Sequence, residues 1–150
     1  MPLYYLWAYC LIMRPTLNDI KQQVDKLAQK IQAPHFMLPD YGYSRQNAQP
    51  HIEIDDNNGQ LYFVVQERGE EFRRDFAHDM DDLLYRIFEH VTFEMASRFE
   101  LNNRIENEDC RRQLFSKQEE LLGILNTGWK ERNQHDHRFT LRSYPFNDNL

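Results

Sequence analysis

The sequence predicts an α+β fold, a small three-stranded antiparallel meander packed with about four helices. Two observations predict it: apolar residues recur at helical spacing in several separate runs, and turn-forming residues divide an alternating stretch into three short strands. At 150 residues the chain has the size of one domain, and its 41% hydrophobic and 28% charged residues are typical of a globular protein. No repeat or Gly/Ser linker divides it, so we expect a single domain over residues 14–142.

An apolar run, LYYLWAYCLIM, occupies residues 3–13. It is too short for a membrane span, which needs about 20 residues. It also lacks the positive leader of a signal peptide. We interpret residues 1–13 as an apolar extension outside the domain, with Met13 as the natural start. The other interpretation is an extra strand or helix packed on the core.

The first predicted helix follows Pro15, where apolar residues recur on one helical face: Leu17, Ile20, Val24, Leu27 and Ile31. Thr16 and Asp19 resemble a capping box with Asp in place of the usual Glu. Pro34 predicts that this helix ends near Gln32, because the residue before a proline avoids the helical region. Residues 33–50 have no apolar period and are predicted to form a long loop, of a kind that often carries function.

The meander comes next. Residues 51–55 alternate as in a half-buried strand, and residues 61–65 have the composition of a more buried one. Between them, Asp56-Asn57-Asn58-Gly59 is typical of a turn. Arg68-Gly69-Glu70 predicts a second turn, and residues 71–76 a third strand.

The C-terminal half is predicted to be helical. Asp79 is the expected N-cap of the longest helix, whose apolar stripe runs from Leu83 to Phe99. Residues 110–125 predict another helix, and a shorter one is expected to begin near Trp129. The polar tail, residues 143–150, is expected to fray.

The net charge is -6, from 18 basic and 24 acidic residues. This acidic balance argues against nucleic acid or a membrane as a partner. By segment, the net charge is +2 over residues 1–52, -10 over residues 53–109 and +2 over residues 110–150. The acidic middle is either a solvated surface or a face that steers a basic partner.

Few residues are arranged for catalysis or metal binding, so we expect no cofactor, no metal and no enzymatic activity. His90 and Glu94 are four apart on a helix, but without an HExxH pattern this spacing is more typical of a surface ion pair. Residues 135–137, His-Asp-His, could share a ligand only in a strand or loop. Asp79, Asp81 and Asp82 suit the start of a helix.

Two other classes of function stay open. The first is a small metal-dependent hydrolase built on His51, Glu53, His90 and Glu94. The second is a non-enzymatic adaptor or oligomerisation module, suggested by the apolar N-terminal run. The two cysteines, Cys10 and Cys110, form no disulfide or metal motif and suit a reducing cytoplasm.

A series of short segments in the middle of the chain resembles a known family. In order they are Tyr62, Val64-Val65, Glu67-Arg68-Gly69-Glu70, Leu83-Leu84-Tyr85, Ile87-Phe88, Val91-Thr92-Phe93, Met95-Ala96-Ser97, Asn103-Arg104-Ile105-Glu106, Asp109, Arg111-Arg112, Phe115 and Glu120-Leu121-Leu122-Gly123. Their order and spacing resemble immunity protein 63, a family of bacterial polymorphic toxin systems, over about residues 17–129. The resemblance implies a cytoplasmic antidote, encoded beside a toxin, that binds the toxin's catalytic domain and performs no chemistry of its own.

The acidic middle of the chain predicts where a basic toxin, such as a nuclease, would bind. The expected contacts are Asp55, Asp56, Glu67, Glu70 and Glu71, with Tyr62 or Tyr85 as an aromatic anchor.

The alternative is the loop of residues 33–50, which carries His35, Tyr41 and Tyr43. We interpret Arg104, Asp109 and Arg112 as a structural ion-pair network that holds two helices.

Overall fold

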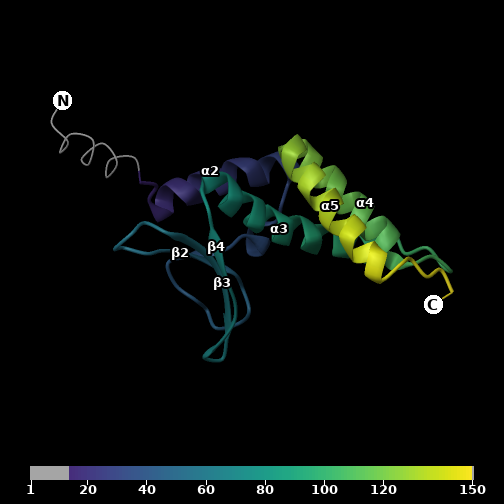
Figure 1. Cartoon of the computed structure of the whole chain (residues 1–150), viewed down its shortest axis with the longest axis horizontal. Coiled ribbons are helices and arrows are strands. Elements are labelled where there is room, and N and C mark those ends of the chain that lie inside the picture. The colour runs from purple at the N-terminus through teal and green to yellow at the C-terminus, as the bar shows by residue number, and fades with distance from the viewer. Residues whose placement is uncertain (1–13, 150) are drawn as a thin grey trace. The chain divides into compact units, whose positions relative to one another are not determined.

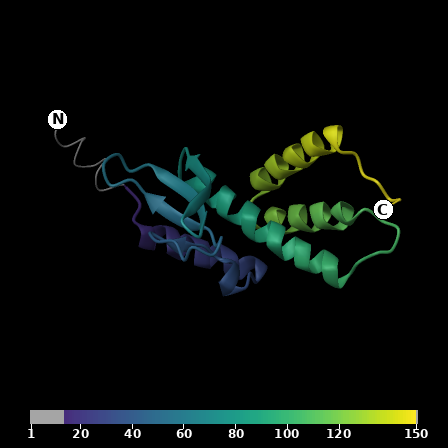
Figure 2. The same cartoon turned by 90° about the horizontal axis from the view of Figure 1, so that it is seen from below.

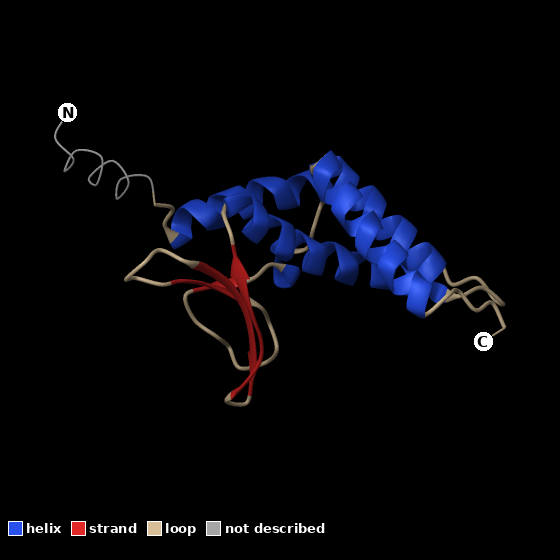
Figure 3. Cartoon of the chain, in the orientation of Figure 1, coloured by secondary structure: helices blue, strands red, loops and turns tan. Residues whose placement is uncertain are grey.

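The computed structural model describes residues 14–149 and has the predicted α+β fold (Figures 1 and 3). Its elements, in chain order, are α2 (Leu17–Ile31), the 3-10 turn η1 (His35–Met37), β1 (Asp40–Tyr41), β2 (His51–Ile54), β3 (Leu61–Glu67), β4 (Glu70–Ala77), α3 (Met80–Asn102), α4 (Cys110–Leu125) and α5 (Thr127–Ser143). Residues 1–13, interpreted above as an extension, lie outside the described residues.

Two compact units make up the described chain. Residues 14–25 and 39–83 form the first, which we call the sheet unit, and residues 26–38 and 84–149 form the second, the helical unit. The boundary falls within α2 and again within α3.

The sheet has four strands in the order β1-β2-β3-β4, so the prediction of three strands was short by one. The additional strand, β1, lies in the predicted loop and pairs in parallel with β2. Backbone hydrogen bonds join Asp40 N to Pro50 O at 2.9 Å and Gly42 N to Ile52 O at 2.8 Å. A two-residue strand has no periodicity to reveal it, which is why the sequence pattern missed it.

β3 pairs antiparallel with β2 on one side and with β4 on the other, as the meander predicted. Cross-strand partners share a face of the sheet. Ile52, Leu61, Phe63 and Ala77 lie on one face and are buried. The opposite face, which we call the outer face, carries His51 and Glu53 of β2, Tyr62, Val64 and Gln66 of β3, and Arg74 and Phe76 of β4. His51 and Val64 are buried within it.

A two-residue turn, Arg68-Gly69, joins β3 to β4 at the tip of the hairpin seen in Figure 3. Both residues have positive φ, 51° for Arg68 and 83° for Gly69. This is the backbone of a type I′ turn, whose twist suits a hairpin. Arg68 is therefore held in a conformation that residues other than glycine, Asn and Asp rarely adopt.

Capping of α2 follows the sequence prediction. Asp19 N donates to Thr16 Oγ1 at 3.1 Å, and Thr16 N donates to Asp19 Oδ2 at 2.8 Å. The two residues thus satisfy each other's backbone donors, as a capping box does. These bonds also hold the pKa of Asp19 below its ordinary value.

In the helical unit, α4 and α5 lie side by side (Figures 1 and 2). Asn126 alone separates them: its N–H donates to Leu122 O at the end of α4, and its side chain accepts from Trp129 N at the start of α5. α5 has 17 residues against 16 in α4, so the prediction of a shorter last helix was wrong. The predicted turn is compressed into one residue that caps both helices.

The C-terminal tail is held against the start of α4, so the expected fraying is not observed. Its yellow trace runs beside the loop before α4 in both views (Figures 1 and 2). Arg112 makes two bonds of 2.9 Å to the Asp148 carboxylate, and Asp148 accepts from Asp109 N at 2.8 Å. Arg111 donates to the carbonyls of Tyr144 and Pro145.

Asp109 caps α4 and pairs with the Arg111 guanidinium, and these bonds hold its pKa well below the ordinary 3.8. Because the pKa of Asp109 is lower in the folded state than in the unfolded state, its charge stabilises the folded protein at pH values above 3.8. This stabilisation is lost as the pH falls from 3.8 toward the folded-state pKa. Since Asn still caps a helix, Asp109→Asn removes mainly the charge. We expect a Tm several degrees lower at pH 7, with the difference shrinking as the pH falls from 5 to 3. Thermal unfolding followed by circular dichroism, with Asp56→Asn as the control, checks this; a difference unchanged across the pH range would contradict it.

The strained turn gives a second prediction about stability. Asn tolerates positive φ better than Arg, so Arg68→Asn should raise the free energy of unfolding by about 0.5–1 kcal/mol. Urea denaturation measures this change. Arg68→Ala is the control, because alanine shares the backbone restriction of arginine and should bring no gain.

Candidate functional site

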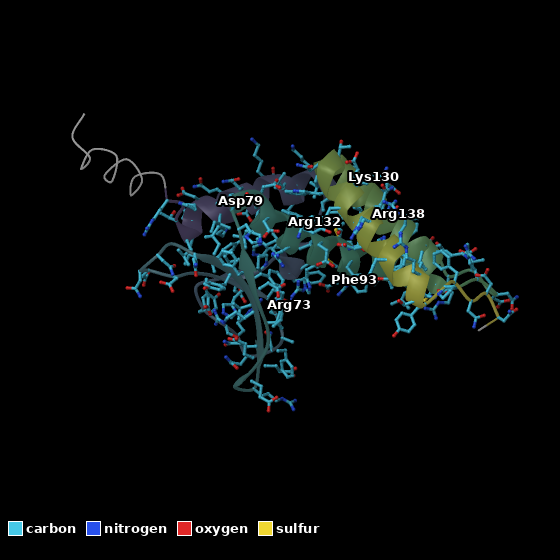
Figure 4. All side chains as sticks on the ribbon, in the orientation of Figure 1. Arg73, Asp79, Phe93, Lys130, Arg132 and Arg138 are labelled. Atoms are coloured by element: carbon cyan, nitrogen blue, oxygen red, sulfur yellow. The ribbon has the colours of Figure 1, made fainter. Side chains whose placement is uncertain are left out.

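The negative charge of the protein resides in the sheet unit. Its described residues include 13 acidic and 6 basic side chains, a net of -7. The helical unit has 11 acidic and 12 basic side chains, a net of +1. Figure 4 shows three of these cations, Lys130, Arg132 and Arg138, along α5. A partner attracted by negative charge is therefore steered to the sheet unit.

Four aspartates gather at one end of the sheet. Asp55 and Asp56 lie in the turn between β2 and β3, where Asp55 Oδ1 accepts from Asn57 N at 2.8 Å. Asp79, labelled in Figure 4, and Asp81 follow β4 at the start of α3. Because Leu61 and Ala77 are register partners, the turn and the helix start are at the same end of the sheet.

Three glutamates lie at the opposite end, around the hairpin tip. Glu67 and Glu70 flank the turn and are register partners, and Glu71 follows on β4. The seven residues of β3 separate this group from the aspartates by about 20 Å at roughly 3.3 Å per residue. The acidic residues singled out from the sequence thus form two groups rather than one cluster.

Arg74 connects Glu71, of the glutamate group, to Glu53 on the outer face. Its guanidinium donates to Glu53 Oε2 at 2.8 Å and makes two bonds of 2.9 Å to the Glu71 carboxylate. The bonds lower the pKa of both carboxyl groups and raise that of Arg74. Glu53 also contacts His51 Nε2 at 2.8 Å.

An aromatic row lies beside this network. The Tyr62 and Phe76 rings meet edge to face with centroids 6.1 Å apart, and Phe76 meets His78 in the same way at 5.1 Å. Arg74 lies over the Tyr62 ring at 5.3 Å. Phe76 remains 40% exposed. Sequence reasoning named Tyr62 but missed Phe76 and His78. Phe76 is the register partner of Tyr62, a pairing that the sequence pattern does not show.

Tyr85, the other proposed anchor, is not at the surface. It is 3% exposed, meets Trp129 edge to face, and has Arg132 over its ring at 3.9 Å. Burial is the main cause that raises its pKa to about 12. Its ring belongs to the core of the helical unit and is closed to a partner.

The alternative loop has both buried and exposed aromatic side chains. Tyr41 is largely buried, and burial raises the pKa of its hydroxyl. Tyr43 is exposed and its hydroxyl lies 3.4 Å from Asp40 Oδ1. His35 is exposed in η1. The part of the loop near residues 46–48 instead pairs with the end of β3.

Arg104, Asp109 and Arg112 each have an ion-pair partner outside this set of three. Arg104, just after α3, makes two bonds to Glu100 of that helix. Asp109 pairs with Arg111, and Arg112 pairs with Asp148. Asp109 and Arg112 therefore help to hold the tail against α4. In the sequence, the acidic residue Asp148 in the tail is the feature that could have indicated this contact with Arg112.

Two of the four candidate ligands of a hydrolase contact each other: His51 Nε2 lies 2.8 Å from Glu53 Oε1. Glu94 pairs instead with Arg98 at 3.4 Å. His137, of the His-Asp-His segment, contacts Glu119 Oε1 at 2.7 Å and Gln118 Oε1 at 3.1 Å. Within residues 14–149, no group of three or more His, Cys, Asp or Glu side chains is placed to hold a metal ion. The described helices are all too short or too polar to cross a membrane.

Comparison with known proteins adds one finding. No match was found among curated proteins or among solved structures. The family described as immunity protein 63 matches residues 56–139, more than half of the chain, from the turn after β2 into α5. The match covers most of the outer face and the hairpin tip. The chain belongs to the immunity protein 63 family.

Proposed function

We propose that this protein neutralises a basic toxin domain by binding it across the outer face of the sheet, without catalysis of its own. Membership of an immunity protein family supports a toxin partner. We choose this surface because of the net charge of the sheet unit, which is -7 against +1 for the helical unit. A nuclease, which must bind a polyanion, is a class of toxin that fits this charge.

The size of the surface fits a single partner. A typical interface covers about 800 Å² on each side, a patch roughly 30 Å across. That patch spans the distance of about 20 Å between the aspartate group and the glutamate group along β3. A toxin that touches both groups across the outer face would lie over Tyr62, Arg74 and Phe76. The partner would then meet an aromatic centre with a charged rim, as many interfaces do.

The function is tested first by co-expression in bacteria with the toxin domain encoded beside it. We expect growth to be restored and the two proteins to purify as a complex. Cell death together with failure to form a complex would refute the function, whichever surface is involved.

Charge reversal tests the acidic rim. Asp55→Lys with Asp56→Lys should lower the association rate constant about tenfold at low salt, and the effect should shrink at high salt because exposed charges are screened. The control reverses Glu106 and Glu108 in the helical unit, which changes the net charge equally. Stopped-flow or surface plasmon resonance measures the rates. Equal slowing by both variants would mean that only net charge matters and would remove the outer face from the proposal.

Truncation tests the aromatic centre. Phe76→Ala and Tyr62→Ala should each weaken the complex by about 2 kcal/mol, mainly through faster dissociation. Phe139→Ala is the matched control, because this exposed ring lies on α5. Calorimetry gives the affinities, and thermal unfolding shows whether each variant is folded. Unchanged affinity in folded variants would place the binding site elsewhere.

A further inference from the structure

A histidine of the helical unit has an oxygen atom against each of its two ring nitrogens. His137 of α5 is buried. Its Nδ1 lies 2.7 Å from Glu119 Oε1 and its Nε2 lies 3.1 Å from Gln118 Oε1, both in α4. Phe115, also in α4, stacks on the same ring with centroids 3.8 Å apart and planes 9° apart. His137 therefore joins α5 to α4 through two polar contacts and one stacked ring.

The orientation of the Gln118 amide is fixed from its other side. Its Nε2 donates to the backbone carbonyl of Glu89, in α3, at 2.9 Å. Because a carbonyl oxygen only accepts, the amide nitrogen must face Glu89, and the amide oxygen must face His137. Gln118 is 1% exposed, so a side chain rotated away from these contacts would leave polar atoms buried without partners.

Glu119 is the charged group that contacts the ring. The cavity beside His137 is lined by three charged side chains, Arg112, Glu119 and Arg138. Arg112 is paired with Asp148 of the tail, and Arg138 is exposed to solvent. α3 reaches the ring through Gln118, which bonds to the backbone of Glu89 and not to its carboxylate. The Glu119 carboxylate is therefore the charge that most strongly affects a proton on the ring.

Both oxygens that face His137 are acceptors, since an ionised carboxylate only accepts. A neutral imidazole has one N–H and satisfies one of them, whereas an imidazolium has two and satisfies both. The stacked Phe115 ring also suits a cation. When a proton leaves, we expect Nδ1 to keep its hydrogen, because its bond to Glu119 is charge-assisted and a lone pair there would face negative charge. The bond to Gln118 is then lost.

We propose that His137 is a pH-sensitive link between α4 and α5. When protonated, it donates to Glu119 and Gln118 together. When neutral, it donates to Glu119 alone, and α5 is released from Gln118 and from the contact that Gln118 makes with α3. This inference does not rest on the proposed function, because it concerns the helical unit, whereas the proposed function places the toxin on the sheet unit.

Ring nitrogen chemical shifts test which atom holds the proton. Two-dimensional ¹H–¹⁵N spectra of the full chain are recorded from about pH 5 to 9, which spans the range in which histidine ordinarily changes charge. We expect both nitrogens of His137 to be protonated at the acidic end and Nδ1 alone at the basic end. A neutral ring protonated on Nε2 would overturn the inference, since it would place a lone pair against the Glu119 carboxylate.

Amide hydrogen exchange measures the effect on α5. Its protection factors, which remove the intrinsic effect of pH on exchange, should fall about threefold over the same pH range in the wild type. His137→Gln removes the titrating ring. Glu119→Gln supplies an amide that can donate to Nδ1 or accept from it, so a neutral ring can keep both bonds. Both variants should lose the pH dependence.

His135→Gln is the matched control. His135 lies two residues away on α5, is exposed and contacts Asp136 at 3.6 Å, so its replacement should leave the pH dependence unchanged. Thermal unfolding shows whether each variant is folded, and Glu119→Gln is nearly isosteric. Wild-type protection that does not change with pH would overturn the inference. So would a pH dependence that persists in folded His137→Gln and Glu119→Gln.

Discussion

The backbone pairing of β3 with both β2 and β4 is the constraint on which the candidate surface depends. Because cross-strand partners share a face, this register aligns Glu53, Tyr62 and Phe76 across three strands. It also brings Arg74 within reach of carboxylates from two strands. A shift by one residue would exchange the faces and bury the charged network in place of Ile52 and Phe63. The surface is thus specified by the same pairing that makes the core.

The charged network on this face fixes the positions of its side chains more than it stabilises the fold. Exposed ion pairs contribute little to the free energy of folding. Arg74 nevertheless has two carboxylates and an aromatic ring as neighbours, which hold its guanidinium in one place. A partner bound to this face would therefore meet side chains that are already positioned, and fewer of them would lose conformational freedom on binding.

The sequence predicted the fold class, the capping box of α2 and the positions of β2, β3 and β4, because each has a local signal such as a periodicity or a turn. It could not reveal β1, whose two residues depend on a distant strand, or the buried position of Tyr85, which depends on Trp129. The contact between Gln118 and His137 was missed for the same reason, since it joins α4 to α5. Sequence reasoning found the acidic residues but not their separation into two groups, since only the sheet register shows that β3 lies between them.

The open space around Gly69 has a consequence for how such a protein can diversify. A Cβ atom added there would have no neighbouring heavy atom within 4 Å, so the hairpin tip has room on the side where a side chain of residue 69 would lie. Longer loops could replace the Arg68-Gly69 turn while β3 and β4 stay in place. A lineage could in this way change the surface of the hairpin by altering loop length and sequence at one position. The hairpin tip is equally a suitable place to graft a foreign peptide.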